Sequence, residues 1–148
     1  MRIMYCENEK SLMLGDYIAY AGTNYRISRL CVRNGSAYEP TCVVALDRGD
    51  GEQIYLRKCE IKGLEPIPLT PDMLKANEWK HLEKGEGQIC YGAHWEYDDE
   101  PGLYLEEDEG GALSIDVGGY QRIIPDVQSL QHLLRLLGFH GLADNFKI

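Results

Sequence analysis

The chain has 148 residues, of which 44% are hydrophobic and 26% are charged, and its formal net charge is −9 at pH 7. This composition predicts a folded protein of one domain or of two small modules and excludes extensive disorder. No apolar run reaches the roughly 20 residues that cross a bilayer, and no basic segment followed by an apolar stretch opens the chain. We therefore expect no membrane association and a cytoplasmic location.

The net charge is concentrated in residues 85–121, where no Lys or Arg occurs between Lys84 and Arg122. The carboxylates of this stretch are Glu86, Glu96, Asp98, Asp99, Glu100, Glu106, Glu107, Asp108, Glu109 and Asp116. Residues 1–84 contain equal numbers of basic and acidic side chains. The negative electrostatic field of residues 85–121 favours a basic partner and disfavours nucleic acid as a partner of the whole chain.

The cysteines are widely spaced and form no Cys-x-x-C pair. They are Cys6, Cys31, Cys42, Cys59 and Cys90. Their odd number and their distance from any histidine at ligand spacing predict free thiols in a reducing compartment. We accordingly expect no disulfide framework, no metal ligands and no cofactor.

Residues 1–66 are predicted to form a β-rich SH3-like module, either a small barrel or a curled antiparallel sheet. Alternating or β-branched segments at 15–20, 25–32, 41–46 and 53–57 predict the strands. Asn34-Gly35 and Gly49-Asp50-Gly51 mark tight turns between them.

Residues 67–148 are predicted to form a second, α+β module. Pro66 and Pro68 fix an extended boundary, and Thr70 followed by Pro71 predicts a helix start. We expect this short helix to carry Met73, Leu74 and Trp79 on its apolar side and to end near Asn77.

The acidic stretch alternates like a sheet. Apolar residues at every second position predict strands at 89–97, 103–105 and 113–117, with a fourth short strand at 120–124. Asp126 is a candidate N-cap of a helix whose apolar stripe runs through Val127, Leu130, Leu134 and Leu137, and Gly138 is expected to end it. The expected order is α-β-β-β-(β)-α, with both helices on one face of the sheet.

The segments Glu65-Pro66-Ile67-Pro68-Leu69-Thr70-Pro71 and Gln128-Ser129-Leu130-Gln131-His132-Leu133-Leu134-Arg135 resemble motifs of a known group. It comprises small uncharacterised proteins encoded in the chromosomes, prophages and mobile elements of gut anaerobes. The chain departs from the group at Asn77-Glu78-Trp79, where Asn-Gly-Phe is common, and at Asp126-Val127, where Val-His is usual. The resemblance implies a fold and a genomic setting, and no activity.

The candidate interaction site is an acidic rim, which sequence patterning places at two turns and on the polar face of the sheet. Its residues are Glu96, Asp98, Asp99, Glu100, Glu106, Glu107, Asp108 and Glu109. His94, Glu96, Glu106 and Asp116 share the predicted polar face, where an N/O metal site is the alternative to a solvated surface.

The sequence favours a non-enzymatic protein-interaction or accessory module, because no nucleophile, base and orienting group occur together in a recognisable pattern. A DNA-mimic inhibitor acting through residues 85–121 is one alternative. Another is nucleic-acid binding by the first module, whose mixture of basic and aromatic residues includes Arg26, Arg29, Arg33, Arg48, Arg57, Lys58, Lys62, Tyr17, Tyr20, Tyr25 and Tyr55. A homodimer is expected only if Trp95 and Tyr97 are left uncovered by helices.

Overall fold

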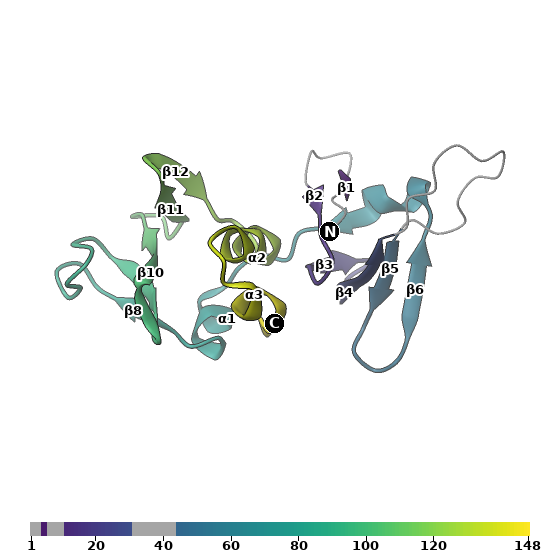
Figure 1. Cartoon of the computed structure of the whole chain (residues 1–148), viewed down its shortest axis with the longest axis horizontal. Coiled ribbons are helices and arrows are strands. Elements are labelled where there is room, and N and C mark those ends of the chain that lie inside the picture. The colour runs from purple at the N-terminus through teal and green to yellow at the C-terminus, as the bar shows by residue number, and fades with distance from the viewer. Residues whose placement is uncertain (1–3, 6–10, 31–43) are drawn as a thin grey trace.

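The computed structural model describes residues 4–5, 11–30 and 44–148 (Figure 1). Within these residues the chain forms two antiparallel five-stranded sheets and one further pair of strands, β1 (Met4–Tyr5) and β2 (Ser11–Leu12). This arrangement confirms the α+β class. The expected turn at Asn34-Gly35, and Cys6, Cys31 and Cys42, lie outside the described residues.

The first sheet has the strand order β6-β5-β4-β3-β7. Its elements are β3 (Tyr17–Tyr20), β4 (Thr23–Leu30), β5 (Val44–Asp47), β6 (Gln53–Leu56) and β7 (Leu64–Glu65), with a 3-10 helix η1 (Lys58–Gly63) before β7. In the described part of the chain these strands form an open sheet and not a closed barrel. Apolar side chains that include Leu12, Ile18, Ile27 and Leu46 form its core.

Helix α1 (Pro71–Ala76) begins as predicted, because the Thr70 hydroxyl accepts a hydrogen bond from the Met73 amide at 3.2 Å. Asn77 ends the helix, also as predicted. The expectation that Trp79 lies on this helix is wrong. Glu78 adopts a left-handed φ of 68°, which redirects the chain, and Trp79 opens strand β8 (Trp79–Leu82).

The second sheet has the order β12-β11-β10-β9-β8. The remaining strands are β9 (His94–Tyr97), β10 (Glu100–Glu107), β11 (Leu113–Val117) and β12 (Tyr120–Ile123). The strand expected to start at Ile89 begins only at His94. Residues 83–93 instead form a connection, in which the Gly85 amide donates a hydrogen bond to the Tyr91 carbonyl oxygen at 2.7 Å. The alternating residues 89–93 therefore do not form a strand.

Helices α2 (Val127–Leu136) and α3 (His140–Asp144) pack with α1 on one face of the second sheet (Figure 1). The Asp126 side chain caps α2 by accepting from the Ser129 amide at 2.7 Å, as predicted, whereas α3 was not expected. Trp95 and Tyr97 are only 3% and 9% exposed beneath these helices. The helices therefore cover the face of the sheet that carries Trp95 and Tyr97.

The second core takes its residues from the sheet and from all three helices, and includes Trp79, Leu105, Leu130 and Phe146. Its first residue in chain order is Ile67, whereas the first core ends at Leu64. The segment between them is held against the start of α2, because the Val127 amide donates to the Ile67 carbonyl at 2.9 Å. Helix α2 also contacts β3, so it joins the two sheets.

Candidate functional site

The structure separates the acidic rim into groups at opposite ends of β10. Asp98 and Asp99 form the turn before this strand and are exposed, together with Glu100, its first residue. Asp108 and Glu109 follow its last residue and are also exposed. Eight residues of strand at about 3.3 Å per residue place the two turns roughly 23 Å apart. The rim is therefore two acidic groups and not one continuous edge.

Glu96 and Glu106 lie on the outer face of the second sheet, which is the face away from the helices. The register pairs Glu106 with His94 and Glu96 with Tyr104 on this face, and it pairs Leu105 with the buried Trp95 on the other. The expected sharing of one polar face by His94, Glu96 and Glu106 therefore agrees with the register.

His94 is completely buried although it lies on the outer face. Its Nδ1 is 2.7 Å from the Gly92 carbonyl oxygen and its Nε2 is 3.0 Å from Oε1 of Glu96. The connection 83–93 covers the ring, because Gly87 packs directly against it. In the described parts of the chain no three His, Cys, Asp or Glu side chains converge well enough to hold a metal ion.

Tyr104 packs edge-on against His94, with the ring centroids 5.7 Å apart. Burial raises the pKa of the Tyr104 hydroxyl above its ordinary value, and the charges of Cys90, Glu106 and Asp116 raise it further. This face therefore combines one enclosed histidine with carboxylates whose field opposes further negative charge.

Glu107 is the one rim residue on the helix-covered face. Its Oε2 accepts from the indole Nε1 of Trp95 at 2.9 Å and lies 3.0 Å from Nε2 of His81. The side chain is 24% exposed. Because its partners are a buried tryptophan and a neighbouring histidine, Glu107 satisfies the polar atoms of this face and is a poor candidate for contact with a partner.

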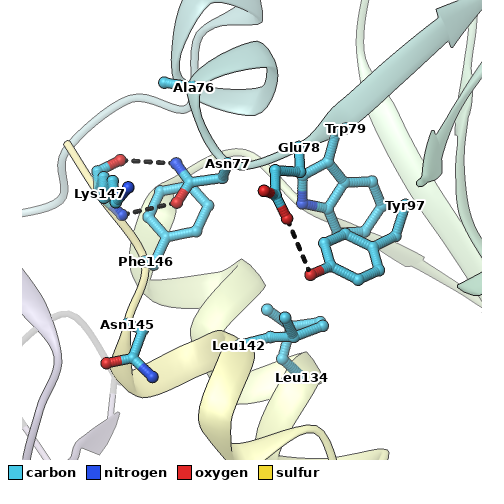
Figure 2. Close-up of a pocket in the computed structure, with 10 residues that line it drawn as sticks. All are labelled: Ala76, Asn77, Glu78, Trp79, Tyr97, Leu134, Leu142, Asn145, Phe146 and Lys147. Carbon is cyan, nitrogen blue, oxygen red and sulfur yellow. Dashed lines mark hydrogen bonds between the residues drawn. The ribbon is translucent and has the colours of Figure 1, made fainter. Parts of the chain in front are cut away.

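A cavity of about 200 Å³ opens at the end of the second sheet where α1 leads into β8 (Figure 2). Trp79 and Tyr97 from the sheet, Leu134 and Leu142 from the helices, and Phe146 from the C-terminal segment form its apolar walls. Glu78 lines the same cavity, and one of its carboxylate oxygens lies 3.5 Å from the Tyr97 hydroxyl.

The cavity lies beside the first acidic group of the rim. The Asp98 amide donates to the Glu78 carbonyl at 3.0 Å, which holds the β9–β10 turn next to Glu78. Burial raises the pKa of Tyr97, and the negative charges of Glu78, Asp99 and Asp98 add to the effect. Sequence patterning missed this association, because Glu78 precedes the acidic stretch and is brought beside Asp98 only by the pairing of β8 with β9.

A polar cluster joins the two sheets, with Asp16 at its centre. Asp16 is fully buried just before β3. Its Oδ1 accepts from Nη1 of Arg135 at 2.6 Å, and its Oδ2 lies 2.7 Å from Nε2 of His132 and 3.1 Å from Nε2 of Gln128. The Met13 amide also donates to Oδ2 at 2.9 Å, so this carboxylate has both a charged partner and neutral donors.

Gln131 extends the cluster by one further set of bonds. Its Oε1 accepts from the Tyr17 amide at 2.9 Å, and its Nε2 donates to the carbonyl oxygens of Gly15 and Ala143 at 3.0 Å each. The α2 residues of the cluster recur at helical spacing, at positions 128, 131, 132 and 135. Sequence patterning assigned no role to these four side chains, because polar residues at this spacing are equally typical of a solvated helix face.

Two arginines of the first sheet already have partners in the folded chain. Arg26 donates to the backbone carbonyl oxygens of Gly15 and Asp144, and Arg48 forms an ion pair with Asp50 at 2.9 Å. Hydrogen bonding to Asp50 raises the pKa of Arg48 further above its ordinary value. A nucleic acid would have to displace these contacts, so the first sheet offers phosphate fewer unpaired cations than its sequence suggests.

No family model, curated protein or solved structure matches the chain. Across the described residues, no helix combines the length and the apolar character needed to cross a membrane.

Proposed function

We propose that this protein is a non-enzymatic interaction or accessory module that binds a basic partner protein through the acidic end of its second sheet. The observation that supports the proposal is that the β9–β10 turn with Asp98, Asp99 and the adjoining Glu100 is held next to Glu78 by the hydrogen bond from the Asp98 amide to the Glu78 carbonyl oxygen. All four are exposed. Among the described residues none of them forms an ion pair with a Lys or Arg. Carboxylates placed in this way steer and orient a cationic surface.

The wider setting that we propose follows from the resemblance to the gut-anaerobe group. In that setting the protein is a cytoplasmic product of a phage or mobile element, and its partner belongs to the host or to the element. The open first sheet is, in this proposal, a variant of an SH3-like layout that supports the second sheet through α2.

Salt-sensitive capture tests the proposal. The triple variant D98N/D99N/E100Q removes the charges with little change of shape, whereas E65Q/E83Q/E86Q removes three exposed charges outside the rim. Each surface charge contributes about 0.5 kcal/mol of binding free energy. We therefore expect the first variant to bind the captured partner about tenfold more weakly at low ionic strength. We expect the second variant to bind it like the native chain.

Two outcomes would count against the proposal. One is capture that does not weaken as the salt concentration rises, and the other is an equal loss in both triple variants. If duplex DNA competes for the captured partner, the DNA-mimic alternative is favoured. If the full chain retards DNA or RNA in a gel at low salt, the nucleic-acid-binding alternative is favoured.

A further inference from the structure

Strand β12 forms one edge of the second sheet. It pairs with β11 on one side, and no described strand pairs with it on the other (Figure 1). All four of its residues are exposed, and its large apolar side chains, Tyr120 and Ile123, are 78% and 71% exposed. An edge that offers both unpaired backbone groups and apolar side chains is a template for one more strand.

The hydrogen-bond pattern fixes which backbone groups of β12 are available. The Ile124 amide donates to β11 at 2.9 Å, and hydrogen-bonded pairs recur at every second position of an antiparallel ladder. Tyr120 and Arg122 therefore direct their N–H and C=O groups toward β11. Gln121 and Ile123 direct theirs away from the sheet. A strand that extends this sheet must therefore bond to Gln121 and Ile123.

A second copy of β12 fits this edge in an antiparallel register centred on Gln121. The Gln121 residues of the two copies then exchange a reciprocal pair of backbone hydrogen bonds. Ile123 of each copy lies opposite Gly119 of the other, where no Cβ competes for space. Tyr120 of each copy lies opposite Arg122 of the other as a non-hydrogen-bonded pair, in which cross-strand side chains are closest.

The first sheet already contains this combination of side chains in the same geometry. Tyr17 on β3 lies opposite Arg26 on β4, and the Arg26 guanidinium carbon is 5.3 Å from the centre of the Tyr17 ring. The next pair along the ladder is hydrogen-bonded, because the Ile27 amide donates to the Asp16 carbonyl oxygen at 2.8 Å. Tyr17 and Arg26 are therefore also a non-hydrogen-bonded pair, and their contact is a cation–π interaction.

We propose that β12 pairs with β12 of a second copy in the register centred on Gln121, which joins the two acidic sheets into one. Within the described residues Arg122 has no ion pair, so its guanidinium is available to the tyrosine of the other copy. A register centred on Arg122 would instead place the two guanidinium groups opposite each other, and like charges in that position destabilise a strand pair. The proposal uses a different surface from the proposed function and goes beyond it.

The test is a dilution series of the full chain followed by NMR of the backbone amides. One short strand pair buries less than the about 1,200 Å² of a stable interface, so we expect a dissociation constant of roughly 0.1–1 mM. The amide signals of Gln121 and Ile123 should shift with concentration. Those of Tyr120 and Arg122, which face β11, should shift less and serve as internal controls.

Salt separates this association from capture by a basic partner. Each chain carries a net charge of −9, so screening of the repulsion between two copies should tighten the dimer at least about twofold as the salt concentration rises. Capture by a basic partner should weaken under the same change. Weaker self-association at high salt would overturn the proposal and leave the proposed function untouched.

A matched pair of variants tests the backbone contact. Gln121→Pro removes the outward N–H and keeps the bonds to β11, so it should abolish the concentration-dependent shifts. Gln121→Ala keeps that N–H and should dimerise like the native chain. Shifts that persist in Gln121→Pro, or shifts at Gln121 and Ile123 that are absent from the native chain, would each overturn the proposal.

Substitution of Arg122 tests the register without altering the backbone. Arg122→Glu should weaken the dimer at least about fivefold, because it replaces the cation beside Tyr120, whereas Arg122→Lys should keep most of the affinity. An equimolar mixture of the native chain and Arg122→Glu should associate more weakly than the native chain alone. Tighter association in the mixture would place Arg122 opposite itself and overturn the proposed register.

Discussion

Asp16 is the residue on which the junction between the two sheets depends most directly. It is fully buried and accepts hydrogen bonds from side chains that lie more than 110 positions away in the sequence. Arg135, its charged partner, has a side chain that is only 4% exposed. A buried ion pair of this kind is costly to break, because the remaining charge is left without a partner.

The variant Asp16→Asn tests this dependence. Asparagine keeps the shape but faces the Arg135 guanidinium without a negative charge, so we expect a loss of about 3–5 kcal/mol of unfolding free energy. Urea denaturation followed by fluorescence measures it. The exposed control Glu65→Gln should stay within about 0.5 kcal/mol of the native chain. A loss below about 1 kcal/mol in Asp16→Asn would show that the cluster does not stabilise the junction.

Single residues also show which structural roles can be predicted from the sequence and which cannot. Thr70 and Asp126 were predicted as helix caps because capping depends on residues within one turn. The role of His132 was not predicted, since its partner Asp16 is distant in sequence and only the folded chain brings them together. Glu78 was missed for the same reason, because its place beside Asp98 depends on the pairing of β8 with β9.

At the scale of elements, the connection between β8 and β9 differs most from its expected form. Its alternating residues predicted a strand, yet Ile89 and Tyr91 are 50% and 72% exposed. The chain here packs across the outer face and covers His94. Gly87 permits this approach, because a Cβ at that position would overlap the His94 ring and lie 2.7 Å from the Cys90 carbonyl oxygen.

Gly87→Ala is therefore expected to displace the connection from His94. The overlap involves backbone as well as a buried ring, so we expect a loss of about 1–3 kcal/mol in urea denaturation. Exposure of the imidazole should also alter the His94 ring signals in NMR spectra. Gly92→Ala is a matched control in the same connection, since a Cβ there meets no atom within 4 Å. Equal stability of the two variants would contradict the packing described for Gly87.

At the scale of the whole molecule, α2 serves both sheets through two stripes. Its apolar residues Val127, Leu130 and Leu134 lie in the second core, and its polar residues Gln131 and Arg135 contact the first sheet. The apolar stripe could be predicted because burial follows helical periodicity. The polar stripe could not be assigned a partner, because charged and amide groups at that spacing are equally common on solvated faces.

The unfolding free energy of the whole molecule depends on pH through two tyrosines of the second sheet, Tyr97 and Tyr104. Burial raises the pKa values of Tyr97 and Tyr104 above the ordinary value of 10.0, and neighbouring carboxylates add to both effects. Below pH 10 both hydroxyls are protonated in the folded and the unfolded chain. Above it the unfolded chain loses these protons first, so the stabilisation is lost as the pH rises through the folded-state values.

We therefore expect the unfolding free energy to fall as the pH rises above about 10, and Tyr97→Phe to reduce the slope of that fall. Urea denaturation at a series of pH values measures the slope in both chains. Tyr91→Phe removes a 72% exposed tyrosine from the connection between β8 and β9 and should leave the slope close to the native one. If Tyr97→Phe and Tyr91→Phe change the slope equally, burial and the neighbouring carboxylates do not raise the pKa of Tyr97 in the folded chain.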